Sequence, residues 1–196
     1  MSDESNSLET SLLELLDLSQ LTCLNESEDH TFKSIVASKA KNTTGAYVLS
    51  DVDEQLLLNI TFNQTVKIRS IVLQTTNLAQ APHTIRLLTN QPSLAFDDLE
   101  EGQSVVAQEI QLTEEQVRDG KRIPLRFVRF QAVTSLHIFV VSNQSGEDQT
   151  RIDVLDVFGM PVACVRSPLE HYPLTEKPPL IYRGVRDLSG LRKQED

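Results

Sequence analysis

The chain has 196 residues and a formal net charge of −10, with eight acids and no Lys or Arg among residues 1–30. Because phosphate contacts need clustered Lys and Arg, this pattern disfavours nucleic acid and anionic membrane surfaces as partners. No apolar stretch approaches the roughly 20 residues that span a bilayer, and MSDESNSLET lacks the regions of a signal peptide. We therefore expect one soluble, non-secreted domain with appendages, in the cytoplasm with the nucleus as an alternative compartment.

The chain has only two cysteines, Cys23 and Cys164, and no CxxC pair. This count argues against a disulfide scaffold and a cysteine-rich zinc site, and it favours a reducing compartment. The sequence leaves open whether the two thiols come close enough for a disulfide.

The N-terminal part predicts a disordered start over residues 1–7 and then a short amphipathic helix. In SLETSLLELLDLSQL, Ser7 is the expected N-cap and four leucines share one helical stripe. These are Leu8, Leu12, Leu15 and Leu16. CLNESEDH and residues 32–49 follow, and their polar, Gly-containing sequence predicts a loop with one short strand.

From residue 55 the hydrophobic period changes from about 3.6 to about 2. QLLLNITF places Leu58 and Ile60 on one face and Asn59 and Thr61 on the other, and VKIRSIVL alternates in the same way. With NQT as the turn between them, the two segments predict a β-hairpin.

Five further segments have the composition of strands. They are HTIRLLTN (83–90), VVAQEIQL (105–112), LRFVRFQAV (125–133), LHIFVV (136–141) and TRIDVLDVF (150–158). Between the second and the third, TEEQVRDG predicts one helical turn that Thr113 caps and Gly120 ends. Since no long helices alternate with the seven strands, the pattern predicts an all-β antiparallel sandwich or barrel.

Residues 166–196 hold four of the eight prolines and show little periodicity, which predicts an extended tail. Leu180, Ile181 and Tyr182 form an apolar island within this tail. Such an island either packs back on the domain or docks a partner.

CLNESEDH brings a thiol, a base and several acids into eight residues. Catalysis by Cys23 and His30 is disfavoured, because Glu26 and its acidic neighbours raise the thiol pKa by disfavouring the thiolate. No Gly-rich phosphate loop, nucleophile elbow or HExxH motif occurs. We therefore expect Cys23 to be a packing residue and the chain not to be an enzyme.

SDVDEQ raises the question of a metal site, because Asp51 and Asp53 share one face of an extended chain. The calcium-loop pattern is incomplete, since it lacks the required Gly and the terminal Glu. A solvated turn is the preferred interpretation, and a cation site completed by a second loop stays open. The histidines lack ligand spacing, so we predict no metal and no cofactor. They are His30, His83, His137 and His171.

Four blocks carry a family resemblance: CLNESEDH, SDVDEQLLLNITFNQTVKIRSI, PLRFVRFQAVTSLHIFVVSNQ and TRIDVLDVFGMPV. Over residues 8–165 the chain resembles the PITH domain, which is found alone and at the C-terminus of a thioredoxin-like protein. The resemblance implies a jelly-roll-like β-sandwich similar to galactose-binding-like and Doc folds, and association with the proteasome regulatory particle. It does not imply the redox activity of the fused relatives, because the chain has no CxxC.

The sequence therefore predicts a monomeric protein-interaction module, with a small-ligand or carbohydrate-binding sandwich as the alternative. Aromatic residues make up 5% and Trp is absent, which favours a protein partner over a sugar. The residues expected to contact the partner are Glu26, Asp53, Glu54, Asn143, Leu174, Leu180, Ile181 and Tyr182. An alternative role for motif residues such as Asn25 and Gln131 is to orient loops through hydrogen bonds to the backbone.

Overall fold

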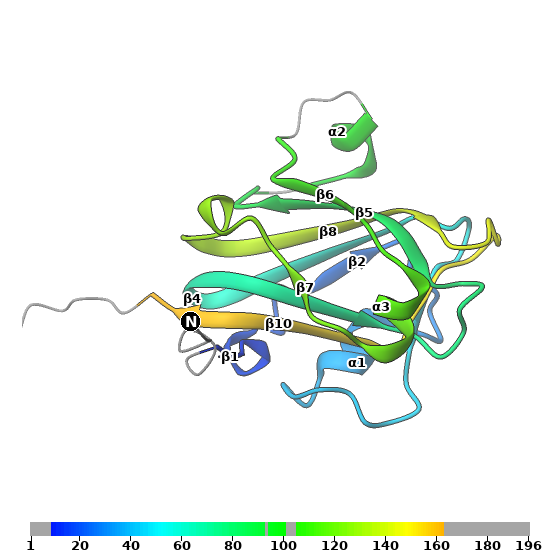
Figure 1. The fold of residues 1–196 in the computed structure, drawn as a ribbon, viewed down its shortest axis with the longest axis horizontal. Coiled ribbons are helices and arrows are strands. Elements are labelled where there is room, and N and C mark those ends of the chain that lie inside the picture. The colour runs from blue at the N-terminus through cyan, green and yellow to red at the C-terminus, as the bar shows by residue number, and fades with distance from the viewer. Residues whose placement is uncertain (1–8, 93, 101–104, 163–196) are drawn as a thin grey trace, which may run out of the picture. The chain divides into compact units, whose positions relative to one another are not determined.

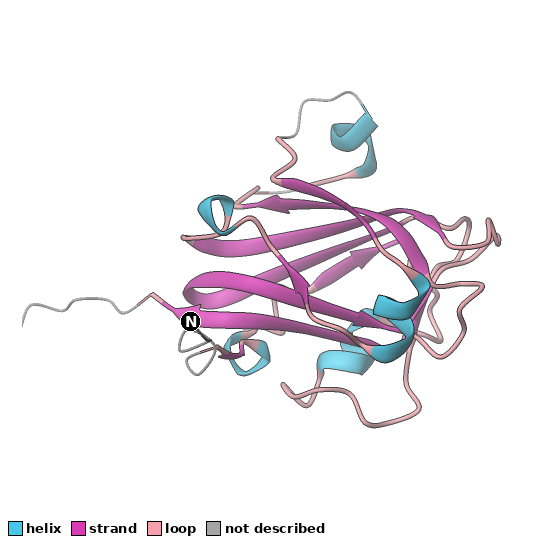
Figure 2. Cartoon of the chain, in the orientation of Figure 1, coloured by secondary structure: helices cyan, strands magenta, loops and turns pink. Residues whose placement is uncertain are grey.

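The computed structural model describes residues 9–92, 94–100 and 105–162, and every strand pairing among them is antiparallel. The strands are β1 (Thr10–Ser11), β2 (Thr22–Leu24), β3 (Val48–Leu49), β4 (Leu56–Gln74), β5 (Pro82–Thr89), β6 (Gln108–Gln111), β7 (Ile123–Pro124), β8 (Val133–Asn143), β9 (Arg151–Ile152) and β10 (Val154–Pro161). The helices are η2 (Leu13–Leu15), α1 (Phe32–Val36), α2 (Phe96–Glu100), α3 (Glu114–Asp119) and η3 (Phe127–Arg129). Figures 1 and 2 show short helices around long strands, so the predicted all-β antiparallel sandwich is confirmed.

The main sheet folds into two layers because its longest strand, β4, belongs to both. The first half of β4 pairs with β2 and β8, and β8 continues to β5 and β6. The second half pairs with β10 and β7, and β10 pairs with β1. The layers lie one above the other in Figure 1. A separate small sheet joins β3 to β9.

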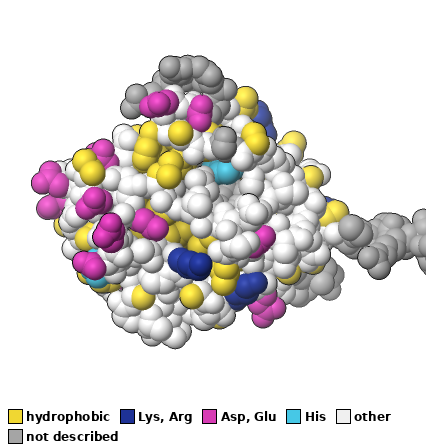
Figure 3. All heavy atoms as spheres, turned by 180° about the vertical axis from the view of Figure 1, so that it is seen from behind, with side chains coloured by type: hydrophobic (Ala, Val, Ile, Leu, Met, Phe, Trp, Pro, Cys, Tyr) yellow, Lys and Arg dark blue, Asp and Glu magenta, His cyan; other side chains and the backbone are white. Residues whose placement is uncertain are grey.

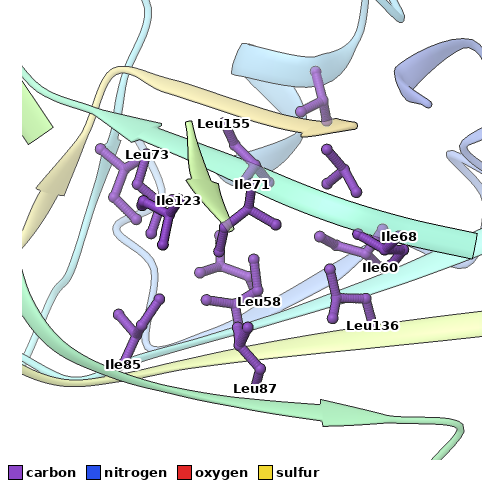
Figure 4. Packing of buried hydrophobic residues seen from close by; sticks show 14 of the residues in the cluster. Leu58, Ile60, Ile68, Ile71, Leu73, Ile85, Leu87, Ile123, Leu136 and Leu155 are labelled. Atoms are coloured by element: carbon purple, nitrogen blue, oxygen red, sulfur yellow. The ribbon is translucent and has the colours of Figure 1, made fainter. Parts of the chain in front are cut away.

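Apolar side chains from both layers fill the space between them (Figure 4). Leu58, Ile85 and Leu87 come from one layer, and Ile71 and Leu155 from the other. Each is at most 1% exposed. Full burial of such a side chain contributes about 1.5–3 kcal/mol, so this core holds the two layers together.

The predicted hairpin over residues 55–73 is wrong, because β4 runs through it as one 19-residue strand. Thr61 lies opposite Ser135 and Val66 lies opposite Val133, so the NQT segment is accommodated as an irregularity in the ladder. NQT lacks the glycine that favours a tight two-residue hairpin turn. The extra residues therefore bend the strand from one layer into the other without reversing it.

The predicted N-terminal helix is shorter than expected over the residues that the structure describes, where it is the 3-10 helix η2. Leu12 and Leu16 are buried as expected, but they flank the single 3-10 turn η2. The Leu12 N–H donates to the Val157 carbonyl at 2.7 Å, and the Asp17 N–H donates to the Thr61 carbonyl at 2.9 Å. These long-range hydrogen bonds replace helical ones. Ser7, Leu8 and the predicted segments 1–7 and 166–196 lie outside the described residues.

Two further segments differ from the prediction. In LRFVRFQAV the residues 127–129 form η3, because the buried positions Leu125, Phe130 and Val133 do not alternate. Residues 32–49 contain the expected short strand, β3, and also the helix α1, whose buried residues are Phe32, Ile35 and Val36. That spacing is helical, so the signal for α1 was present in the sequence.

The predicted helical turn at TEEQVRDG is confirmed as α3. The Thr113 hydroxyl accepts from the Gln116 N–H, and the Gln116 side chain accepts from the Thr113 N–H, which makes a capping box. Gly120 ends the helix in the left-handed region with φ 62°. No helix in the described part of the chain is long and apolar enough to cross a membrane.

A β-bulge interrupts the pairing of β4 with β10. Phe158 lies opposite Ser70 and Gly159 lies opposite Ile68, so Arg69 has no counterpart on β10. A Cβ on Gly159 would lie 1.9 Å from the Lys67 carbonyl oxygen, so the close approach of the two backbones requires glycine here. Bulges of this kind re-aim a side chain, in this case that of Arg69.

Candidate functional site

Three loops meet at one end of the sandwich, and we call residues 25–30, 50–55 and 143–150 the acidic loop end. Glu26 and Ser50 form a β-bridge. The Ser50 N–H donates to the Thr150 carbonyl at 2.9 Å, and the Thr150 N–H donates to the Ser50 hydroxyl at 2.8 Å. These hydrogen bonds therefore join segments that are up to 100 residues apart in sequence.

Asn25 fixes the second of these loops. Its backbone is left-handed with φ 65°, a conformation that Asn tolerates better than most residues. Its amide donates to the Asp53 carboxylate at 2.8 Å and to the Gln55 carbonyl at 2.7 Å, and it accepts from the Val52 N–H at 3.1 Å. Asn25 thus orients a loop through hydrogen bonds, which is the alternative role that the sequence suggested for it.

Asn143 holds the third loop in the same way. Its side-chain oxygen accepts from the Gly146 N–H at 2.6 Å and from the Glu147 N–H at 3.0 Å, and its amide donates to the Glu147 carbonyl at 2.6 Å. The Glu54 carboxylate accepts from the Asn143 N–H at 2.7 Å, which ties the second loop to the third. Asn143 is 5% exposed and its side chain braces the loop, and its predicted contact with a partner stays a prediction.

Four of the predicted contact residues therefore come together in this one place, and the others do not lie in the described part of the chain. Those brought together are Glu26, Asp53, Glu54 and Asn143; those outside the described residues are Leu174, Leu180, Ile181 and Tyr182. Gln131 is exposed between η3 and β8.

Six exposed acidic side chains lie at the acidic loop end, and its three loops contain no Lys or Arg. They belong to Glu28, Asp29, Asp51, Asp53, Glu147 and Asp148. Val52, between two of these acids, is 82% exposed. Residues 143–150 lie on the right of Figure 1, and Figure 3 shows the molecule from behind, so that this end is on the left there. Acidic side chains gather at this end in Figure 3.

Cys23 packs beneath this surface and is not a nucleophile paired with His30. Cys23 is half-buried against the core, and burial, followed by the charge of Glu26, raises its pKa. His30 instead contacts Tyr47, whose hydroxyl lies 2.8 Å from His30 Nε2. Cys164 lies outside the described residues.

We expect Cys23 to react with iodoacetamide at pH 8 at least about tenfold more slowly than free cysteine, because only the thiolate attacks. Peptide mass spectrometry over a time course measures the rate. The same chain unfolded in urea is the control and should react at the ordinary rate. Equal rates in the folded and unfolded chain would contradict the packing role.

Glu26 also has a structural role, because its carboxylate accepts a hydrogen bond from the Phe32 N–H at the start of α1. Burial raises the pKa of Glu26 above its ordinary value. An acid with a raised folded pKa contributes stability that is present below the ordinary pKa and lost as pH rises through the folded pKa.

We therefore expect the stability of the native chain to fall relative to that of Glu26→Gln as pH rises from about 4 to about 7. The glutamine oxygen still accepts the Phe32 N–H, so the two proteins differ mainly in the titrating group. Urea unfolding of both proteins at several pH values measures this. A difference that stays constant with pH would contradict a raised pKa.

The acids at this end do not assemble into a metal centre: no group of three His, Cys, Asp or Glu side chains able to hold a metal occurs among the described residues. Asp53 is occupied by Asn25 and by the Gln55 N–H at 2.9 Å. Two other histidines are also engaged, His83 with Thr84 at 3.3 Å and His137 with Asn59 at 2.7 Å. His171 lies outside the described residues.

Comparison with known families identifies the chain. The family model described as PITH domain matches residues 2–172. The chain belongs to the PITH domain family. This PITH domain is 42% identical over 146 residues to "Thioredoxin-like protein 1" of Schizosaccharomyces pombe, covering 73% of the chain and 49% of that protein. It is 34% identical over 153 residues to "PITH domain-containing protein CG6153" of Drosophila melanogaster, covering 78% of the chain and 70% of that protein.

Solved structures with a similar fold include carbohydrate-binding modules. The family 32 module of NanJ from C. perfringens, in complex with galactose, matches this PITH domain with a TM-score of 0.55 and 12% identity, over 77% of the chain and 99% of that structure. Modules of ZmpB from Clostridium perfringens, in complex with GalNAc, match with a TM-score of 0.57 and 10% identity, over 79% and 37%. At these identities the likeness establishes the galactose-binding-like sandwich fold alone.

Proposed function

We propose that this PITH domain is a non-enzymatic protein-binding module that docks on the proteasome regulatory particle through its acidic loop end. Family membership supports a binding module, since the Drosophila relative is named for the domain and not for an activity. The observation that carries the proposal is the braced surface itself. Hydrogen bonds from Asn25 and Asn143 hold its loops, while six acidic residues and Val52 are exposed.

Physical chemistry explains why such a surface suits a protein partner. Like charges repel one another, so gathering acids at one end is unfavourable unless something offsets the repulsion. Asn25, Glu54 and Asn143 supply hydrogen bonds that fix the loops before a partner arrives. Pre-organised loops lose less entropy on binding, and exposed carboxylates accelerate encounter with a basic surface.

The alternative is carbohydrate binding, which the likeness to modules in complex with galactose and GalNAc favours. A sugar platform needs an aromatic ring with a free face. Tyr47, beside the acidic loop end, stacks on His30 with centroids 3.9 Å apart, and Arg151 Cζ lies 3.7 Å from its centroid. The His30 ring and the Arg151 guanidinium cannot both lie on one face of the Tyr47 ring at these distances, so they cover its two faces. This arrangement supports a protein partner over a sugar.

Affinity capture with the tagged full chain tests the proposal. We expect regulatory-particle subunits in the eluate of the native chain, and fewer with Glu147→Gln/Asp148→Asn, which removes two exposed charges from the acidic loop end. The matched control, Asp97→Asn/Glu114→Gln, removes two exposed charges elsewhere. Absence of these subunits at low salt would overturn the proposal. Saturable thermal stabilisation by galactose or GalNAc would favour the alternative.

A further inference from the structure

A second cluster, formed by other elements, surrounds the β4 bulge, and we call Arg69, Ser70 and Arg122 the arginine site. Ser70 pairs with Phe158 of β10 on one side and with Pro124 of β7 on the other. Arg69 and Arg122 line the same hollow as Ser70. In a chain with a net charge of −10, two arginines that converge on one hollow need a physical reason.

Both guanidinium groups are held by aromatic rings. Arg69 Cζ lies 3.5 Å from the centroid of Phe127, and Arg122 Cζ lies 3.8 Å from the centroid of Phe158. Stacking occupies the face of a guanidinium and leaves the N–H groups at its edge available. The rings therefore fix the two arginine side chains in position, and the guanidinium N–H groups can still donate hydrogen bonds to a ligand.

The site contains buried polar atoms that lack a partner. Arg69 Nε and Ser70 Oγ are buried and make no hydrogen bond with any residue that the structure describes. Ser70 is only 6% exposed. Buried polar groups are nearly always hydrogen-bonded, and leaving one unsatisfied costs about 1–3 kcal/mol. A ligand that accepts hydrogen bonds would satisfy both atoms.

The charges around the hollow define the ligand. Glu9 Oε2 lies 3.8 Å from Arg122 Nη1, too far for a hydrogen bond, so the pair is loose. Two guanidinium groups and one carboxylate leave one net positive charge in the hollow. That balance suits a single negative charge. A planar carboxylate matches the fork of a guanidinium, whereas a phosphate would bring up to two charges.

We propose that the arginine site binds a carboxylate of an acidic peptide segment, either an Asp or Glu side chain or a C-terminal carboxylate. Arg69 and Arg122 donate to the carboxylate oxygens, and the Ser70 hydroxyl donates to one of them. The site does not depend on the proposed function, because it shares no residue with the acidic loop end.

Fluorescence anisotropy tests this with two fluorescein-labelled probes. The first carries four consecutive glutamates and an amidated C-terminus, and the second is a Gly/Ser peptide with a free C-terminal carboxylate. We expect saturable binding of at least one probe, which identifies the source of the carboxylate. Arg69→Gln and Arg122→Gln should each weaken it at least about tenfold. Arg86→Gln on β5 removes the same charge elsewhere and should change affinity less than about twofold.

Ser70→Ala separates binding from folding. It removes an unsatisfied hydroxyl, so the melting temperature should stay the same or rise while probe affinity falls. Failure of both probes to saturate, or equal losses with Arg86→Gln, would overturn the proposal. Displacement by inorganic phosphate in preference to acetate at equal ionic strength would overturn the assignment to a carboxylate. Glu147→Gln/Asp148→Asn should leave probe binding intact, so failure of this site and of the acidic loop end are distinguishable.

Discussion

The Gly159→Ala variant is expected to lose about 3 kcal/mol of unfolding free energy. The added Cβ would meet the Lys67 carbonyl oxygen at 1.9 Å, and a backbone atom in a paired strand cannot move away as a flexible side chain can. Relief requires β10 and β4 to separate at the bulge. Urea unfolding measures the loss, and probe binding at the arginine site should weaken with it, because the bulge aims Arg69.

Gly45→Ala is the matched control for this experiment. A Cβ at Gly45 would have nothing within 4 Å, so the same substitution there should change the unfolding free energy by about 0.5 kcal/mol or less. Equal stabilities for the two variants would show that the strands do not approach as closely at Gly159 as the structure describes.

Asn143→Ala is expected to lower the unfolding free energy by about 2–3 kcal/mol. The change removes a buried side chain and with it the hydrogen-bond partner of the Gly146 and Glu147 N–H groups and of the Glu147 carbonyl. Without these bonds the loop 143–150 is free to move. Capture of the partner should therefore fall even at temperatures where the domain stays folded.

Asn63→Ala, at an exposed asparagine in the irregular part of β4, is the control for this second variant. It should change stability by about 0.5 kcal/mol or less and leave capture unchanged. Full stability and full capture with Asn143→Ala would contradict the bracing role.

Elements specified by local sequence were predictable. The apolar, β-branched composition of LHIFVV and TRIDVLDVF predicts strands, and LHIFVV lies in β8 while TRIDVLDVF covers β9 and the first part of β10. Thr113, Gln116 and Gly120 define α3 because capping uses only neighbouring residues. The antiparallel sandwich followed from these local signals and from the absence of long helices.

Elements specified by distant residues were not predictable from local patterns. NQT reads as a turn, but whether β4 reverses or bends depends on its pairing with β8 and β10. Leu12 and Leu16 have helical spacing. The N–H groups of Leu12 and Asp17 nevertheless donate to the carbonyls of Val157 and Thr61 in distant strands. Tertiary contacts override such weak local preferences.

The candidate site divides in the same way. The polarity of Glu26, Asp53 and Glu54 marked them as loop residues, but their meeting at one end depends on strand order. Asn143 followed an apolar strand, and only its contacts identify it as a buried brace. The sequence pattern marks Arg69 as an ordinary polar residue of an alternating strand, because the bulge at Arg69 arises from the pairing of β4 with β10 and has no local signal.

Docking through the acidic loop end is tested by binding of the full chain to purified proteasome regulatory particle. We predict saturable binding that weakens at least about tenfold with Glu147→Gln/Asp148→Asn. The control Asp97→Asn/Glu114→Gln should change the affinity less than about twofold. No binding at low salt, or equal affinities for the two double variants, would contradict docking through the acidic loop end.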